Sequence, residues 1–241
     1  MHIFILTGAG ISAESGLKTF RDPGGLWEQH DPRTLATPEA FARDAALVHR
    51  FYNWRRQAAR AAEPNPAHHA LARLKRGLAE RGEQLTLVTQ NVDSLHERAG
   101  STVLHMHGSH ANVRCTACGA KEPWAEDLFR ETPCPACGRT GTLRPDIVWF
   151  GETPHHLDAI GAALRRSDAF IAIGTSGAVY PAAGYVAAAR AAAIPTLEFN
   201  LDPADNAGLF DRAIYGKASE TVSRFVDRVL DEGWDAACAA L

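Results

Sequence analysis

The sequence predicts an α/β protein whose parallel sheet is covered by helices on both faces, with a smaller second domain inserted into it. Three observations support this prediction. Apolar runs of strand length alternate with amphipathic segments along most of the 241 residues. A glycine-rich turn follows the first of these runs, and four of the five cysteines lie between positions 115 and 137. Such alternation is typical of parallel sheets, in which crossover helices join the strands.

Turn residues and prolines define the elements of the first half. The apolar run at residues 3–6 ends in Gly8-Ala9-Gly10, which is typical of a buried strand that leads into a helix. The prolines and glycines of residues 21–38 predict an irregular loop. The Ala- and Arg-rich stretch 39–62 has helical character, and Pro66 is suited to begin a helix that runs to residue 76.

The second half alternates more regularly, so we expect strands at its short apolar runs and helices at the amphipathic segments between them. The expected strands are residues 85–89, 103–107, 147–150, 169–174 and 196–200. The expected helices are residues 93–99, 156–166, 182–193 and 221–230. Two stretches interrupt this rhythm and are expected to form the smaller domain, a helical insert at 29–66 and the cysteine segment at 109–145. The sheet domain would then comprise residues 1–28, 67–108 and 146–241.

Bulk composition excludes several classes of protein. With 46% hydrophobic and 22% charged residues, the chain is expected to fold rather than remain disordered. The formal net charge of −3 disfavours a globally basic nucleic-acid binder. The longest apolar runs, such as 168–174, are too short to span a membrane, and no basic region precedes the apolar N-terminus as in a signal peptide. We therefore expect a cytoplasmic protein, in which thiols stay reduced.

The clustered cysteines predict a zinc ribbon. Cys115 and Cys118 form one Cys-x-x-Cys pair, Cys134 and Cys137 form another, and 15 residues separate the pairs. This spacing is typical of four-thiolate zinc sites, with redox dithiols as the alternative. Four protein ligands leave no open position, so the metal would be structural. Cys238 lies alone, and we expect it to have no function.

A second motif indicates a nucleotide. Gly8-x-Gly10-x-x-Ala13 after a strand matches a dinucleotide-binding turn, in which the backbone approaches a pyrophosphate. A dehydrogenase would place an acidic residue at the end of a second strand about 20 positions later, but this region is a loop that contains Asp31. An ordinary dehydrogenase is therefore disfavoured. Polar groups also follow two later strands, at Gly174-Thr175-Ser176 and Asn200-Leu201-Asp202, where open α/β sheets bind ligands.

The motifs occur in an order that closely resembles the sirtuins, the NAD-dependent protein-lysine deacylases, over roughly residues 3–230. The resemblance rests on the segments Gly8–Gly16, Thr19–Arg21, Gln90–Asp93, Met106–Gly108, the two cysteine pairs, Pro145–Glu152 and Gly174–Ser176. It implies a Rossmann-like NAD-binding domain and a smaller domain made of the helical insert and the zinc ribbon. It also implies that NAD and an acyl-lysine peptide enter the cleft between them from opposite sides.

In this family the acyl group passes from lysine to the ribose of NAD and nicotinamide is released, which requires a general base near neutral pH. His107 occupies the position of that base, and we expect His105 to be structural. Asn91 and Asp93 resemble the pair that orients nicotinamide, although either could instead cap the next helix. Phe20 would shield the ribose from water, with ordinary packing as the alternative. The full set implied for NAD is Gly8, Ala9, Gly10, Ser12, Glu14, Phe20, Arg21, Gln90, Asn91, Asp93, Gly174, Thr175, Ser176, Asn200, Asp202 and Ala218.

The acyl-lysine substrate is assigned to two segments. The first would pair with the extended peptide through Val148, Phe150, Gly151 and Glu152, although Trp149 or Phe150 could equally be core. The second contains Tyr52 and Arg55, three positions apart and hence on one helix face.

These two residues resemble the Tyr-x-x-Arg signature of class III sirtuins, which remove succinyl, malonyl or glutaryl groups, and Ala36 matches the small residue that widens their pocket. A guanidinium binds a carboxylate bidentately, so the chemistry fits. The alternative is a solvated arginine and a half-buried tyrosine on an amphipathic helix.

The resemblance thus implies a monomeric enzyme that removes succinyl, malonyl and acetyl groups from proteins or peptides and yields nicotinamide and O-acyl-ADP-ribose. It would consume NAD, hold one structural zinc and bind neither a membrane nor a specific nucleic acid. A protein that is mainly a deacetylase and a protein ADP-ribosyltransferase are the alternative enzymes. A zinc-ribbon nucleic-acid binder is disfavoured because few basic residues flank the cysteines, namely Arg114, Lys121, Arg130 and Arg139.

Overall fold

The computed structural model describes residues 1–19 and 31–241, and its centre is a six-stranded sheet. The strand order is β3-β2-β1-β7-β8-β9, and every neighbouring pair is parallel. The sequence order reverses between β1 and β7, as in doubly wound nucleotide-binding sheets. The prediction of an α/β fold with a Rossmann-like sheet is confirmed. The strands are β1 (His2–Thr7), β2 (Gln84–Thr89), β3 (Leu104–His105), β7 (Ala169–Ile173), β8 (Thr196–Asn200) and β9 (Arg212–Tyr215).

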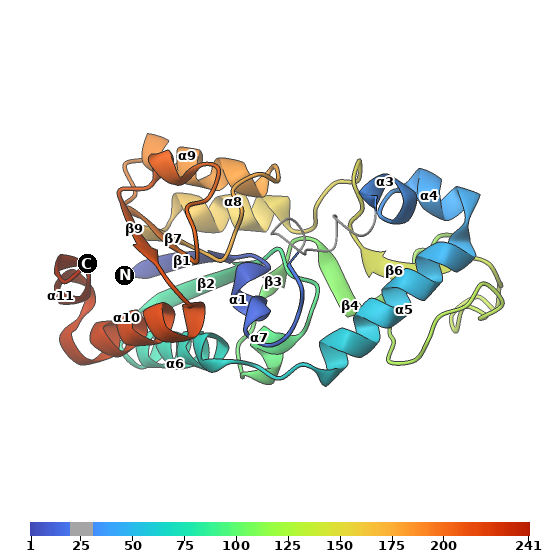
Figure 1. Cartoon of the computed structure of the whole chain (residues 1–241), viewed down its shortest axis with the longest axis horizontal. Helices are drawn as coiled ribbons and strands as arrows, with labels where there is room; N and C mark the ends of the chain where they lie inside the picture. Colours follow the sequence, from blue (N-terminus) through green and yellow to red (C-terminus); the bar gives the residue numbers. More distant parts are fainter. Residues whose placement is uncertain (20–30) are drawn as a thin grey trace.

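Helices cover both faces of this sheet (Figure 1). On one face, α6 (Pro66–Glu80) and α10 (Ala218–Glu232) pack against each other and the sheet, with α11 (Trp234–Ala239) beside α10. On the other face lie α8 (Leu157–Arg165) and α9 (Tyr185–Ala191). Alternate residues of β1 enter the two cores, because Ile3 and Ile5 belong to the first and Phe4 and Leu6 to the second. From Ile3 to Leu6 both faces of β1 are therefore apolar, which explains the uninterrupted hydrophobic run at these positions.

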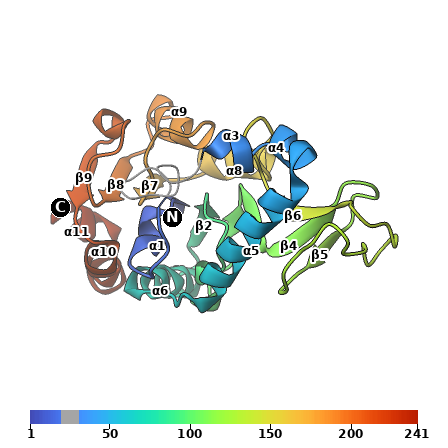
Figure 2. The same ribbon diagram turned by 45° about the vertical axis from the view of Figure 1, so that its right-hand side comes forward.

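A second, antiparallel sheet lies at the end of the molecule far from the termini (Figures 1 and 2). Its order is β5-β4-β6, with β4 (Gly108–Cys115), β5 (Lys121–Pro123) and β6 (Leu143–Ile147). The helices α3 (Pro32–Leu35), α4 (Pro38–Arg43) and α5 (Ala45–Ala61) lie beside it. A separate apolar cluster joins these helices to Ile147 and Trp149. The helical insert and the cysteine segment thus come together as expected.

Several predicted boundaries are wrong for local reasons. The helix expected at 39–62 is interrupted at Asp44, whose carboxylate accepts a hydrogen bond from Leu47 N and caps α5. The expected loop contains α3, because Asp31 caps it in the same way and Pro32 occupies its first turn. The strand expected at 103–107 pairs only at Leu104–His105, so His107 lies in the following turn.

Besides α3, the described residues form elements that were not expected from the sequence, among them β4, β5, β9 and α11. In addition, β6 ends at Ile147, so residues 148–150 do not form the predicted strand. Two short helices, α1 (Gly10–Ala13) and α7 (Leu95–Arg98), and two 3-10 turns, at Ala182–Gly184 and Ala207–Leu209, complete the fold. Among the described residues, no helix has both the length and the apolar character that crossing a membrane requires.

Candidate active site

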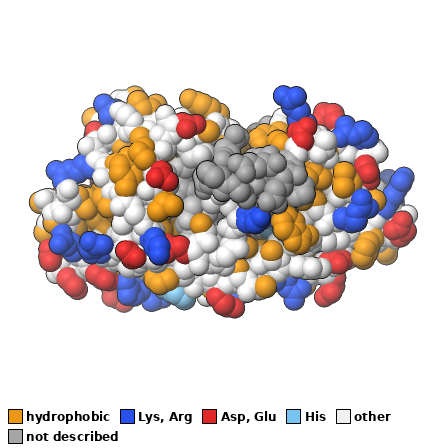
Figure 3. All heavy atoms as spheres, in the orientation of Figure 1, with side chains coloured by type: hydrophobic (Ala, Val, Ile, Leu, Met, Phe, Trp, Pro, Cys, Tyr) orange, Lys and Arg blue, Asp and Glu red, His pale blue; other side chains and the backbone are white. Residues whose placement is uncertain are grey.

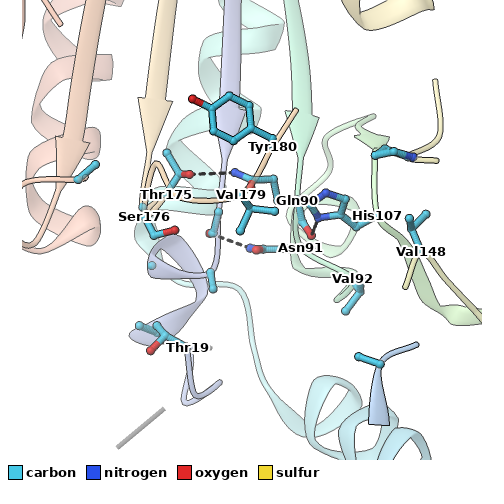
Figure 4. Close-up of a pocket in the computed structure, with 18 of the residues that line it drawn as sticks. Thr19, Gln90, Asn91, Val92, His107, Val148, Thr175, Ser176, Val179 and Tyr180 are labelled. Atoms are coloured by element: carbon cyan, nitrogen blue, oxygen red, sulfur yellow. Dashed lines mark hydrogen bonds between the residues drawn. The ribbon is translucent and has the colours of Figure 1, made fainter. Parts of the chain in front are cut away.

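One large cleft lies where the carboxyl ends of β1, β2, β7 and β8 meet the second sheet, with a volume of about 1280 Å³ (Figure 4). This is the switch point at which open α/β sheets bind ligands. Most of the predicted NAD, catalytic and acyl-lysine residues line it: Gly8, Ala9, Gly10, Glu14, Ala36, Tyr52, Arg55, Gln90, Asn91, His107, Val148, Phe150, Gly151, Glu152, Gly174, Thr175, Ser176, Asn200, Asp202 and Ala218. Ser12 and Asp93 do not line the cleft but are buried behind Asn91. Phe20 and Arg21 lie outside the described residues.

The glycine turn is closed by a contact that the sequence did not indicate. A Cβ atom on Gly8 would lie 2.6 Å from the carbonyl oxygen of Gly174, and one on Gly10 would lie 2.7 Å from Gly174 Cα. Gly10 N also donates a hydrogen bond of 2.8 Å to Gly174 O. The glycines are therefore needed to pack the turn against β7, in addition to any contact with a phosphate. The helix expected after this turn is only the single turn α1.

His107 has the chemistry of a general base. Its Nδ1–H donates to the backbone carbonyl of Gln90 at 3.1 Å (Figure 4), and no described residue hydrogen-bonds to Nε2. This tautomer leaves Nε2 unprotonated. Burial lowers the pKa of His107, the bond to Gln90 opposes that shift, and the charge of His155 adds to it. The imidazole is thus neutral near pH 7 and can accept a proton.

His105, two residues away, is held as a structural residue. Its Nε2 pairs with Glu97 Oε1 at 2.6 Å, and Nδ1 lies 2.9 Å from the backbone oxygen of Asn91. Burial alone would lower its pKa, but the hydrogen bond and charge of Glu97 outweigh it, and the pKa of His105 is raised. Both ring nitrogens are occupied, so His105 has no free atom for catalysis.

Asn91 and Asp93 belong to a buried polar network behind the cleft. The Asn91 amide donates to Gly8 O at 3.0 Å and to Ser12 Oγ at 3.1 Å, and Ser12 Oγ donates to Asp93 Oδ2 at 3.1 Å. Asp93 Oδ1 also accepts from Leu95 N, the first residue of α7, at 3.1 Å, although Ser94 and not Asp93 occupies the N-cap position of this helix. Burial raises the pKa of Asp93, while the bonds from Leu95 N and Ser12 oppose this shift.

Tyr52 and Arg55 lie on the face of α5 that lines the cleft. Both are buried, so the alternative of a solvated arginine and a half-buried tyrosine does not fit. Trp149 Nε1 donates to the Tyr52 hydroxyl oxygen at 3.0 Å, which leaves the hydroxyl hydrogen of Tyr52 available to another acceptor. Burial raises the pKa of Tyr52, so its hydroxyl stays protonated. Burial also lowers the pKa of Arg55, and the nearby charge of Asp93 opposes this shift.

The segment after β6 is anchored by an ion-pair network. The Glu152 carboxylate accepts from Arg144 Nη1 at 2.7 Å, from Arg114 Nη2 at 2.7 Å and from Trp149 N at 2.9 Å. Arg144 also lies 3.2 Å from the centroid of the Trp149 ring. Glu152 therefore lines the cleft with its carboxylate already engaged. Trp149 is a core residue, as the sequence allowed, whereas Phe150 is 43% exposed at the cleft.

Contacts among the predicted NAD-binding residues bridge the switch point. Gln90 Nε2 donates to Thr175 Oγ1 at 3.0 Å (Figure 4), and Asn200 Nδ2 donates to Thr175 O at 2.9 Å. Glu14 accepts from Ser219 N at 2.9 Å and so binds the first turn of α10. Its carboxylate is engaged in this contact, although the residue lines the cleft.

The four cysteines form a compact cluster whose sulfur atoms all lie within 4.8 Å of one another. Cys115 Sγ and Cys137 Sγ are 3.9 Å apart, and Cys118 Sγ and Cys134 Sγ are also 3.9 Å apart. A tetrahedron with zinc–sulfur bonds of about 2.3 Å requires sulfur separations of about 3.8 Å. The donor set therefore fits a structural zinc ion.

Several residues of the cleft were not expected from the sequence, among them Thr19, Val92, His110, Tyr180 and Lys217. Of these, His110 lies on β4, an element that was itself not predicted. On the face shown in Figure 3, Lys and Arg side chains are intermixed with Asp and Glu side chains, and the described residues show no large patch of one charge there.

Comparison with known proteins agrees with this geometry. A model of the Sir2 family matches residues 8–181. A protein of Caulobacter vibrioides named NAD-dependent protein deacylase is 54% identical over 231 residues, which is 95% of this chain and 97% of that protein. A solved complex of a Sir2 homologue with NAD is 39% identical, with a TM-score of 0.85 and coverage of 95% of this chain and 91% of the other. A Sir2 protein bound to an acetylated peptide is 28% identical, with a TM-score of 0.76 and coverage of 96% and 92%.

Proposed function

The chain belongs to the Sir2 family, and from that premise we propose that it is an NAD-dependent protein-lysine deacylase that prefers succinyl- and malonyl-lysine and also removes acetyl groups. The observation that carries the preference is that Tyr52 and Arg55 line the same cleft as His107. A guanidinium binds a carboxylate through two parallel hydrogen bonds, and a phenol hydroxyl adds a further donor, so this part of the cleft suits an acyl group that ends in a carboxylate.

Residues on the β1–β7–β8 side of the cleft would hold NAD, as the polar contacts among Gln90, Thr175 and Asn200 support. Bound NAD supplies a ribose that receives the acyl group as nicotinamide leaves. Asn91 would orient the carboxamide, because two hydrogen bonds fix its side chain at the cleft wall. His107 Nε2 would take the proton from a ribose hydroxyl, since its neutral tautomer presents a lone pair.

The acyl-lysine would enter from the side of α5 and the segment 148–152. Tyr52 would donate its hydroxyl hydrogen and Arg55 its guanidinium to the terminal carboxylate of the acyl group. Ala36 lies at this side of the cleft, where a small side chain leaves room for a longer acyl chain. The exposed Phe150 would contact the peptide around the lysine.

The decisive experiment compares matched peptides that carry acetyl-, malonyl- and succinyl-lysine, with products followed by mass spectrometry. We expect nicotinamide and O-acyl-ADP-ribose from all three. In Arg55→Met, kcat/KM for the succinyl peptide should fall by about 30-fold or more, with a much smaller change for the acetyl peptide. An equal loss on both would refute the assigned role of Arg55.

The same assay tests the two alternative activities. A wild-type protein that acts chiefly on acetyl-lysine would be mainly a deacetylase. Transfer of ADP-ribose to protein without loss of an acyl group would indicate an ADP-ribosyltransferase.

We also propose that residues 29–66 and 109–145 form a domain separate from residues 1–28, 67–108 and 146–241, and that the protein is a monomer. A small apolar cluster that lies entirely within residues 109–145, formed by Val113, Cys115, Leu128, Cys134 and Leu143, supports this division. Light scattering after gel filtration would test the monomer.

A further inference from the structure

His110 is a buried cleft residue to which neither NAD binding nor the Tyr52–Arg55 pair assigns a role. It lies on β4, is 3% exposed and lines the cleft beside Tyr52, with 6.0 Å between the two ring centroids. Its backbone is fixed on both sides, because His110 N donates to Val92 O at 2.7 Å and His110 O accepts from Arg56 Nε at 2.9 Å. The position of the imidazole is therefore set by the fold.

Neither ring nitrogen of His110 has a hydrogen-bond partner in the described part of the chain. Other buried histidines in residues 1–19 and 31–241 include two whose rings are hydrogen-bonded, since His2 binds Thr86 Oγ1 at 2.8 Å and His96 binds Thr7 Oγ1 at 3.0 Å. His49 leaves Nδ1 without a partner, and its ring packs against Phe41. A buried polar group without a partner costs free energy, so an imidazole with two such nitrogens at the wall of a cleft indicates a missing ligand atom.

The surroundings of His110 define the chemistry of that ligand. Burial, and then the charges of Arg55 and Arg56, lower its pKa well below the ordinary value, so the ring is neutral and carries one N–H donor. Tyr52 and Arg55 present further donors on the same side of the cleft. A carboxylate has two oxygens with about four acceptor positions. One phenol hydroxyl and a bidentate guanidinium occupy about three of these positions, so a carboxylate can accept a further hydrogen bond.

We propose that His110 is a third acyl-binding residue, whose ring N–H donates a hydrogen bond to the terminal carboxylate of a succinyl- or malonyl-type acyl group. The inference rests on the proposed function, and it adds a specificity residue on β4 to the two on α5. An acetyl group has no terminal carboxylate and would leave His110 without this bond. His110 should therefore favour acidic acyl groups without affecting the reaction at the ribose.

The test uses His110→Leu, which keeps an apolar group of similar size and removes both nitrogens. For the succinyl peptide, kcat/KM should fall by about tenfold or more, mainly through KM, while the value for the acetyl peptide stays within about twofold. His110→Gln retains a donor and should recover part of the succinyl activity. The matched control is His49→Leu, another histidine that is 3% exposed but does not line the cleft, which should leave the ratio of the two activities unchanged.

The outcomes separate this role of His110 from the function on which it rests. If Arg55→Met loses desuccinylation but His110→Leu does not, or if His110→Leu loses both activities equally, the acyl pocket stands and the role of His110 is wrong. If the wild type does not act on succinyl-lysine at all, both proposals fail. A thermal melt of each variant shows whether it is folded. Should His110→Leu fail to fold, His110→Ala replaces it in the same comparison with His110→Gln, and an unchanged ratio of the two activities would overturn the proposal.

Discussion

At the scale of single residues, the environment of each titratable side chain determines its use. His105 and His107 are two residues apart, yet one is held by Glu97 and the other has an unbonded nitrogen near the cleft. The motif around His107 predicts that this residue, rather than His105, is the general base, and its unbonded Nε2 supports that prediction. The engagement of Glu14 and Glu152 by Ser219 and Arg144 was not predictable, because these contacts join positions that only the fold brings together.

The pKa of His107 leads to a prediction for pH. Because burial lowers this pKa, the neutral imidazole persists below pH 6.5, and deacylation should be lost only as the pH falls through the lowered value. A profile of kcat/KM from about pH 5 to about pH 8 should therefore show its acidic limb below the ordinary histidine pKa of about 6.5. His107→Ala should remove the activity across the whole range. An acidic limb well above that value would mean that another group limits the rate.

At the scale of elements, local signals predicted the buried strands and failed for the second sheet. The cores of β1 and β7 are apolar on both faces, and β2 and β8 carry buried apolar residues on at least one face, so these runs stand out in the sequence. In contrast, β4 contains polar residues such as Ser109 and His110 that become buried only through contact with α5 and β6. His110 could not be recognised as a site residue for the same reason, because its burial arises from pairing between distant segments.

Asp44 offers a test at this scale, since it ends α4 and caps α5, the helix that carries Tyr52 and Arg55. Asp44→Ala removes the acceptor for Leu47 N and should lower the free energy of unfolding by about 1 kcal/mol. Asp44→Ser keeps an acceptor and should lose less. Chemical denaturation measures both. A stability unchanged in Asp44→Ala would show that the cap contributes nothing.

At the scale of the whole molecule, a parallel sheet and an antiparallel sheet meet at one cleft. The order of motifs along the chain, through the family resemblance, predicted a cleft between a Rossmann-like domain and a smaller domain, but not the antiparallel sheet. The contact of Gly8 and Gly10 with Gly174 shows what the motif alone could not, namely that the nucleotide turn also joins two strands at the switch point.

Removal of zinc should affect the second sheet first. The cysteines lie at the end of β4 and in the loops beside β5 and β6, and Cys115 and Cys134 belong to the small apolar cluster there. A chelator, or Cys134→Ser, should therefore lower the Tm and the deacylase activity together. Metal analysis by mass spectrometry should find one zinc per chain before treatment. Full activity in a verified metal-free protein would contradict a structural role.

The buried Arg56 connects His110 on β4, at the cleft, with the loop that precedes Cys134. It follows Arg55 on α5 but does not line the cleft, and it donates to His110 O at 2.9 Å, Asn53 Oδ1 at 3.0 Å and Glu126 O at 3.3 Å, the last in the loop that precedes Cys134. One turn of helix thus lines the cleft at the proposed acyl pocket with one arginine and contacts the cysteine-bearing loop with the next. Thermodynamic linkage makes any such coupling mutual. If metal binding favours acidic acyl groups by holding this turn of α5 in place, then an acidic acyl group in the cleft must strengthen metal binding by the same free energy.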